Sequence, residues 1–146
     1  YASVGFGSYT TLLGEVYLNH ELSSNEIIGG YMSHHSSQGG IENLLLDDDF
    51  LDTRLDMFYK QEESDFDWQL NGGVRFQKYN WYGLPNINFE TSSIDAITEQ
   101  QNYGYYELNG EIIFEDSYFK GADIKYRRFW DAVKSGENRI VFIPDR

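Results

Sequence analysis

The sequence contains no cysteine, few prolines and few basic residues. Because cysteine is absent, the chain can form neither a disulfide framework nor a cysteine-bearing zinc site. Its 11 Lys and Arg stand against 24 Asp and Glu, which gives a formal net charge of −13. Binding of phosphates requires clustered basic residues, so we expect no nucleic-acid partner.

The sequence also has no run of about 18 apolar residues, the length that a transmembrane helix needs. We therefore expect no helical membrane protein. The same observation does not argue against a membrane-spanning β-barrel, because its strands alternate apolar and polar residues and so contain no long apolar run. No signal peptide is visible at the start. With 146 residues we expect a single unit, 1–146, and because the chain opens within a strand-like pattern and without Met, we expect it to belong to a longer protein.

The most prominent pattern that is present runs from Tyr1 to Leu22. Apolar residues such as Val4, Phe6 and Leu18 alternate there with polar residues and glycines. Alternation with a period of two is typical of a β-strand with two different faces, and this one persists for about twice the usual strand length. The pattern predicts one long strand whose apolar face contacts lipid or a protein core.

Further alternating stretches follow, separated by turn residues. They predict strands at 26–36, 51–61, 66–77, 103–115, 121–130 and 140–143, about seven in all, with a short helical turn starting at Ser92. Connections near Ser24, Ser64 and Ser117 are short, and those near Gly39, Asn88 and Ser135 are longer. An all-β, antiparallel up-and-down meander would place the short turns at one rim and the long ones at the other, as in outer-membrane barrels and some lipocalin-like barrels.

Aromatic residues make up 17% of the chain and recur near the expected strand ends. The apolar face from Trp68 to Phe76 would span about 20 Å along the membrane normal at a strand tilt of about 40°, close to the apolar band of a barrel. Aromatics at both ends would then lie at the membrane interfaces. The alternative is that they form the core of a β-sandwich. We favour the first interpretation, in which the seven strands are part of a larger transmembrane β-barrel.

The polar positions of the later strands carry charges of both signs. If the apolar face meets lipid, these residues form the wall of an aqueous lumen; in the alternative they are ordinary cross-strand pairs. The predicted lumen wall consists of Asp67, Arg75, Glu107, Glu111, Asp123, Lys125 and Arg127.

An acidic run is the candidate metal site. Asp47, Asp48, Asp49 and Asp52 offer the oxygen ligands that Ca²⁺ and Mg²⁺ take. Their spacing is not that of an EF-hand, and a solvated acidic loop is the alternative. The sequence singles out no pair of carboxylates for acid–base chemistry, so we expect no enzyme activity and no other cofactor.

Four stretches, 33–40 (SHHSSQGG), 65–68 (DFDW), 79–85 (YNWYGLP) and 134–138 (KSGEN), resemble segments of gram-negative outer-membrane β-barrel proteins of the TonB-dependent-receptor-like or porin-like kind. The resemblance implies a location in the bacterial outer membrane, contact with outer-membrane lipid, and a transport or surface-binding role. Neither a plug domain nor an energy-coupling box is visible. Other outer-membrane or periplasmic proteins would be its protein partners.

We therefore expect a barrel segment for transport or uptake of a small nutrient. The predicted ligand or surface-loop contacts are Trp81, Tyr82 and Trp130. A soluble β-sandwich or lipocalin-like binding module, with Trp68 added to those stacking residues, is the first alternative. A structural or adhesive subunit of a surface assembly is the second.

Overall fold

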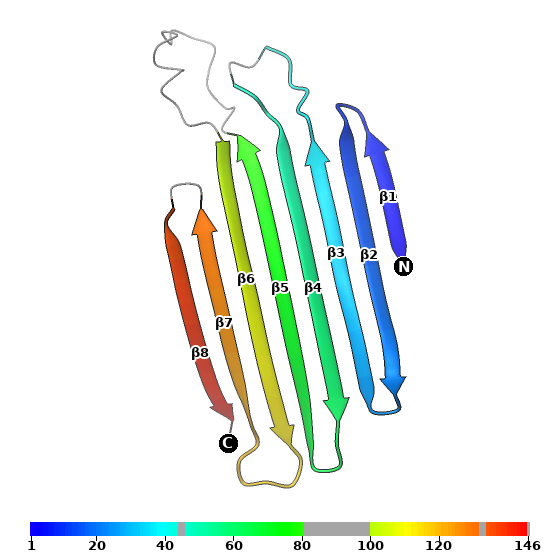
Figure 1. Cartoon of the computed structure of the whole chain (residues 1–146), viewed down its shortest axis with the longest axis vertical. Helices are drawn as coiled ribbons and strands as arrows, with labels where there is room; N and C mark the ends of the chain where they lie inside the picture. Colours follow the sequence, from blue (N-terminus) through cyan, green and yellow to red (C-terminus); the bar gives the residue numbers. More distant parts are fainter. Residues whose placement is uncertain (44–45, 81–99, 132–133, 146) are drawn as a thin grey trace.

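The computed structural model describes residues 1–43, 46–80, 100–131 and 134–145. Within these ranges eight strands form one antiparallel sheet, and each strand pairs with the next one along the chain (Figure 1). The strands are β1 (Ala2–Gly7), β2 (Thr11–Ser23), β3 (Glu26–Ser37), β4 (Phe50–Glu62), β5 (Phe66–Asn80), β6 (Gln100–Phe114), β7 (Gly121–Asp131) and β8 (Gly136–Asp145). The predicted all-β antiparallel meander is confirmed.

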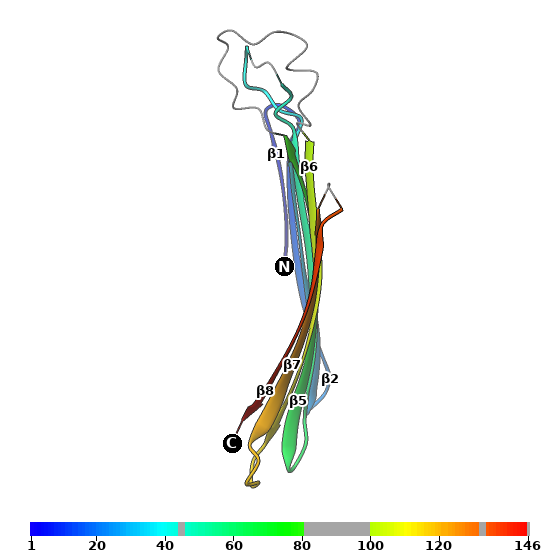
Figure 2. The same cartoon turned by 90° about the vertical axis from the view of Figure 1, so that its left-hand side faces the viewer.

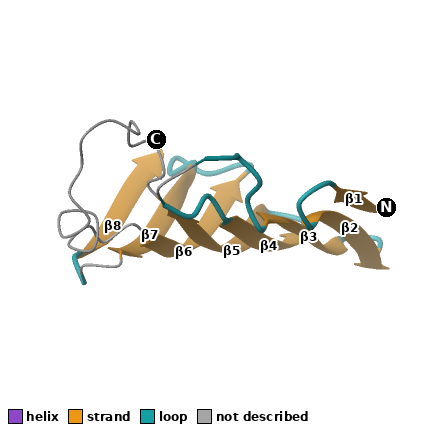
Figure 3. Ribbon diagram, turned by 90° about the horizontal axis from the view of Figure 1, so that it is seen from above, coloured by secondary structure: helices purple, strands orange, loops and turns teal. Residues whose placement is uncertain are grey.

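The sheet is a single open layer. The views from the side and from above show a twisted band with no second layer among the described residues (Figures 2 and 3). β1 and β8 each pair with one strand, so the eight described strands do not close into a barrel. In the described part of the chain there is no helix long and apolar enough to cross a membrane.

The prediction of one strand from Tyr1 to Leu22 is wrong, because a tight turn divides it into β1 and β2. The amide of Thr11 donates to the carbonyl of Ser8 at 3.2 Å, and Tyr9 and Thr10 between them have φ angles of 59° and 55°. These angles are those of the hairpin turn that asparagine and glycine usually form, and neither occurs at its centre. The hairpin also pairs Phe6 with Leu12, so even-numbered residues stay on one face and the alternation continues through the turn.

The other predicted strands are confirmed with small changes at their ends. The largest change is in the last one, which begins at Gly136 instead of Ile140. The longer connection expected near Ser135 is therefore wrong, because only residues 132–135 join β7 to β8. Pro144 lies inside β8, where it is tolerated because β8 is an edge strand. The helical turn expected at Ser92 lies outside the described residues.

The β7–β8 hairpin ends lower on the sheet than the other three hairpins of the same rim. Upper and lower rim denote the upper and lower ends of the strands in Figure 1. At the upper rim the last pair of the β7–β8 hairpin, Trp130 with Gly136, lies level with Gly14 in β2, three residues below the start of that strand at Thr11.

The register separates the side chains into two faces, which we call the apolar face and the polar face. On the apolar face the charged strand residues among those described are Glu26, Lys78 and Arg128, each within three residues of a strand end. The polar face carries its charges along the whole length of the strands, among them Glu15, Asp52, Arg54, Asp56, Lys60, Asp67, Arg75, Glu107, Glu111, Asp123, Lys125, Arg127 and Arg139.

No hydrophobic side chain in the described part of the chain is buried. Along the apolar face Phe6 is 83% exposed, Leu108 49% and Phe142 61%. The accessible surface of the chain is 10530 Å², whereas a compact monomer of this mass exposes about 7,700 Å². The sheet therefore has no hydrophobic core of its own, and its apolar face needs a partner.

Candidate functional site

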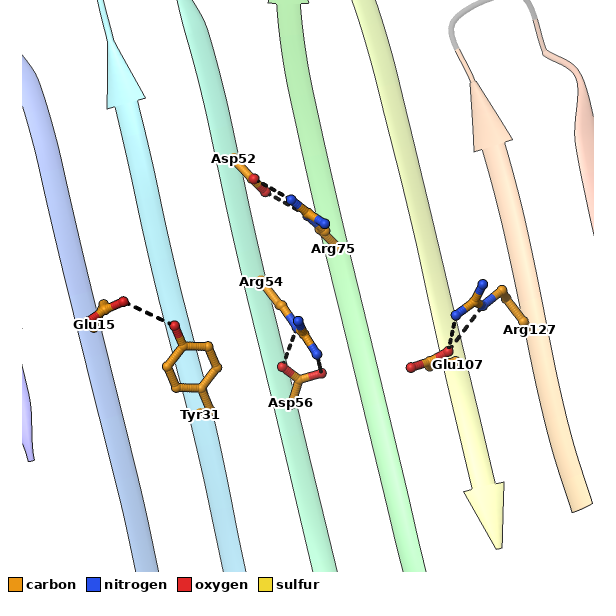
Figure 4. A network of polar contacts seen from close by, with 8 residues as sticks. All are labelled: Glu15, Tyr31, Asp52, Arg54, Asp56, Arg75, Glu107 and Arg127. Atoms are coloured by element: carbon orange, nitrogen blue, oxygen red, sulfur yellow. Dashed lines mark hydrogen bonds and ion pairs between the residues drawn. The ribbon is translucent and has the colours of Figure 1, made fainter. Parts of the chain in front are cut away.

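Ion pairs between neighbouring strands cross the polar face (Figure 4). Arg75 on β5 donates to both carboxylate oxygens of Asp52 on β4, at 2.9 and 2.6 Å. Arg127 on β7 donates from Nε and Nη2 to one oxygen of Glu107 on β6, at 3.1 and 2.7 Å. These pairs join residues 23 and 20 positions apart and so fix the alignment of the strands that carry them.

A shallow groove lies at the middle of the polar face. Arg54 pairs with Asp56 two residues further along β4, with Nε and Oδ2 at 2.6 Å. The neighbouring position on β5 is Gly73, where a Cβ atom would lie 2.8 Å from Oδ1 of Asp56. The missing side chain leaves room between Asp56 and Glu107, in a groove of about 370 Å³ that also reaches Phe58.

The register places all seven predicted wall residues on the polar face. Arg75, Glu107, Lys125 and Arg127 take part in its ion pairs, with Lys125 Nζ 3.8 Å from Glu107. Asp123 accepts a hydrogen bond from Asn109 at 3.0 Å. Asp67 and Glu111 share the face at its lower end.

Aromatic rings line the upper part of the polar face. The rings of Tyr79 and Tyr103 stack at 5.5 Å, and their hydroxyls lie 3.2 Å apart. Phe129 continues the row, with its ring 6.0 Å from that of Tyr103. On the same face, Phe50 on β4 extends the row toward β3, where its ring contacts that of His35 edge to face at 4.8 Å. The row thus extends from β3 to β7 directly above the ion pairs.

A pocket of about 530 Å³ opens at the upper rim, where β3, β4 and β5 end. Tyr9 from the β1–β2 turn closes one side by packing its ring against Gly40, where a Cβ atom would lie 2.2 Å from the ring. The φ angles of Gly39 and Gly40, +86° and +148°, are ones that glycine adopts readily. Asp48 holds this bend by accepting hydrogen bonds from the amides of Gly40 and Ile41 at 3.0 and 2.9 Å.

The predicted acidic cluster is dispersed among other partners. Asp48 binds the backbone amides described above, Asp49 pairs with Lys78 at 2.9 Å, and Asp52 pairs with Arg75. Among the described residues, no three His, Asp or Glu side chains, Asp47 included, lie close enough together to hold a metal ion. Asp48, Asp49 and Asp52 are therefore partnered by backbone amides and basic side chains of the chain itself.

The predicted tryptophan contacts fall in different places. Trp81 and Tyr82 lie outside the described residues. Trp130 lies on the apolar face, where its ring covers Gly104 and packs edge to face against Phe76 at 5.7 Å. Trp68 lies on the same face, 5.0 Å from the ring of Tyr59. The described tryptophans are thus on the face opposite to the ion pairs.

The aromatic row and the rim pocket were not predicted from the sequence. A signal was available for the row, because Tyr79, Tyr103 and Phe129 interrupt the polar positions of their strands with aromatic residues. No comparable signal existed for the pocket, whose residues come from segments up to 71 positions apart, Tyr9 to Asn80. Comparison with known proteins adds no further constraint: no family model, curated protein or solved structure matches this chain.

Proposed function

We propose that this chain forms part of the wall of an outer-membrane β-barrel that transports a small polar nutrient. Its apolar face contacts lipid, and its polar face lines the aqueous interior. The observation that carries this proposal is the contrast between the faces: large hydrophobic side chains are exposed along one, and ion pairs follow the other. The proposed role is passage of a solute and not catalysis.

The extent of the apolar face supports lipid as its partner. Exposed apolar patches on soluble monomers rarely exceed a few hundred Å², whereas here such residues occur on every strand from Val4 in β1 to Phe142 in β8. A β-sandwich would bury them against a second sheet, and the described residues form one sheet. The absence of charge from the middle of this face fits a hydrocarbon environment.

Strand dimensions support the same proposal. A tilted strand needs about 9–11 residues to cross a bilayer, and β5 and β6 have 15 residues each. The lower-rim connections are short, at 24–25, 63–65 and 115–120, and the longest connections, 38–49 and 81–99, leave from the upper rim. In outer-membrane barrels the rim with long loops faces outside the cell.

The solvent of each face can be tested by tryptophan quenching in reconstituted vesicles. In a Trp81→Phe background, the fluorescence of Trp68 and Trp130 should be quenched strongly by lipids with brominated acyl chains and weakly by aqueous iodide. A second variant moves one probe by a single residue to the polar face. It combines Trp68→Phe and Gln69→Trp with Trp130→Phe and Trp81→Phe, so that the new tryptophan is its only one. That probe should show the opposite preference. Equal quenching of the two probes by brominated lipid would contradict the proposal.

Membrane extraction tests the location directly. The protein should remain in the membrane fraction of the cells that produce it after an alkaline wash, should dissolve in detergent, and should migrate differently on a gel before and after boiling. Vesicles containing it should swell in a small neutral solute. A protein that is fully soluble without detergent, with a single cooperative melt, would overturn the lipid assignment. The apolar face would then be the inner face of a soluble sandwich or lipocalin-like module.

A further inference from the structure

One cluster of polar side chains interrupts the apolar face, close to the upper end of the β7–β8 hairpin. Tyr106 on β6 pairs in register with Arg128 on β7, and Arg128 pairs with Asn138 on β8, so the three side chains form one row. All three are exposed. Tyr126 lies next below Arg128 on this face of β7, and its hydroxyl donates to Oδ1 of Asn138 at 3.1 Å. We call Tyr106, Arg128 and Asn138 the polar row.

The charge of Arg128 is not compensated by a carboxylate within the described part of the chain. None of the ion pairs found there includes Arg128, whereas Arg127, its neighbour on the polar face, pairs with Glu107. Among the described strand residues of the apolar face the one acid is Glu26, at the lower end of β3. The guanidinium of Arg128 interacts instead with the uncharged hydroxyl of Tyr106. An anion that contacts this guanidinium would therefore be favoured.

The donors of the polar row match an anion with several acceptor oxygens. Arginine presents its N–H donors in a planar fork that fits the oxygens of a phosphate group. Oδ1 of Asn138 already accepts from Tyr126, so the side chain of Asn138 offers a ligand its amino group, which is a further donor. One positive charge flanked by donors favours a phosphate group over a cation or a neutral molecule.

The surface below the polar row is apolar along the same strands. Ile124 on β7 and Ile140 and Phe142 on β8 are all exposed and lie between the row and the lower end of the sheet. Above the row, the ring of Trp130 lies 6.0 Å from that of Tyr106. Tryptophan and tyrosine are enriched where lipid headgroups meet hydrocarbon. A free phosphate would use only the row, whereas a phospholipid would also cover the apolar residues with its acyl chains.

We propose that the polar row binds the phosphate group of an anionic membrane lipid. Arg128 supplies the positive charge, Tyr106 and Asn138 supply hydrogen bonds, and the acyl chains lie along the apolar residues below. This inference rests on the proposed function, because it requires the apolar face to meet a bilayer. The net charge of the chain, −13, cannot produce the same preference, because it repels anionic lipids.

Trp130 is a built-in reporter for this site, and Trp68 at the other end of the apolar face is its internal control. Two variants each keep one of them, Trp68→Phe with Trp81→Phe and Trp130→Phe with Trp81→Phe. Both are reconstituted in mixtures of phosphatidylglycerol and phosphatidylcholine in which only one lipid carries brominated acyl chains. Quenching of Trp130 should indicate an about fivefold higher affinity for phosphatidylglycerol, the effect of one basic residue near anionic lipid. Trp68, whose row contains Glu26, should show no such preference.

Substitutions of Arg128 test the residue that carries the charge. Arg128→Gln should abolish the preference at Trp130, and Arg128→Lys should keep most of it because the charge remains. The matched control is Arg139→Gln, which removes the same charge from an exposed position on the polar face of the neighbouring strand and should leave the preference unchanged. Each variant is checked for the circular dichroism spectrum of the parent protein. The comparison of Trp130 with Trp68 needs no change in the polar row, so it decides the outcome even if Arg128→Gln fails to fold.

Several results would overturn the assignment. Equal quenching of Trp130 by the two brominated lipids would show that the row does not select an anionic headgroup, although the apolar face still meets lipid. A preference that persists in Arg128→Gln would place the site elsewhere. Loss of the preference on adding millimolar glycerol 3-phosphate would reassign the row to a soluble phosphate. If neither tryptophan is quenched by either lipid, the lipid contact of the apolar face fails, and this site fails with it.

Discussion

The two faces of this sheet consist of alternate residues of the same strands, and they differ in charge, in hydrophobicity and in the ion pairs that they carry. On β6, Leu108 is 49% exposed on the apolar face, while its neighbour Glu107 points to the polar face and pairs with Arg127 at 2.7 Å. Apolar groups that stay exposed across eight strands, beside polar groups that are paired, indicate that the missing partner of the sheet is on the apolar side. The polar side chains are therefore partnered within the chain itself, whereas large apolar side chains of the opposite face stay exposed in it.

The largest expected effect comes from placing a charge on the apolar face. Leu108→Arg should destabilise the membrane-inserted protein by about 2–4 kcal/mol, because a guanidinium near the middle of the bilayer loses its hydration. The measurement is denaturant unfolding from lipid vesicles, followed by tryptophan fluorescence.

The matched control for Leu108→Arg places the same charge on the polar face. Gln69→Arg lies in register with Glu111 and Lys60, and it should change the free energy of unfolding by less than about 1 kcal/mol. If the two arginine variants are equally stable in vesicles, the faces do not differ in solvent as proposed.

An intermediate effect is expected at glycines covered by aromatic rings. A Cβ atom at Gly104 would lie 2.2 Å from the ring of Trp130, and one at Gly29 would lie 2.3 Å from the ring of Phe58. Gly104→Ala and Gly29→Ala should each destabilise the protein by about 1–3 kcal/mol, because the ring must leave its position. These two glycines are on opposite faces, so similar losses would show that ring packing is tight on both.

Gly14→Ala is the control for these glycine variants. A Cβ atom at Gly14 meets no other atom within 4 Å. The substitution should be neutral or stabilise by up to about 1 kcal/mol, because alanine loses less backbone entropy on folding. A loss at Gly14 as large as that at Gly104 would mean that backbone conformation, and not ring contact, sets the cost.

The smallest effect is expected from the ion pairs of the polar face. A double-mutant cycle with Asp52→Asn and Arg75→Gln should give a coupling energy of about 1 kcal/mol, because the pair is bidentate but a third exposed to water. The Lys60–Glu62 pair, which is more exposed, serves as the reference and should give a coupling near zero. High salt should weaken the Asp52–Arg75 coupling, and a salt-independent value would contradict a water-filled interior.

Much of the fold could be predicted from alternation, and the errors have specific causes. In β5 the alternation of apolar residues from Phe66 to Phe76 correctly predicted the strand and the residues that share its apolar face. The β1–β2 hairpin was missed because its turn residues, Tyr9 and Thr10, are unusual at positive φ and because the alternation stays in phase through the turn. For the acidic run, the sequence indicates a shared candidate cation site, and the structure adds that three of its members bind separately to Gly40, Lys78 and Arg75.

The sequence by itself determined which residues share a face, because side chains alternate with a period of two that the extended backbone imposes. It therefore determined the apolar face and the membership of the polar face. Only the tertiary structure decided which residues of that face meet, such as Asp52 with Arg75, because register depends on turn geometry and on hydrogen bonds between strands. The rim pocket belongs to the same category: Tyr9, Asp48 and Asn80 come together only after three separate strand ends have been aligned.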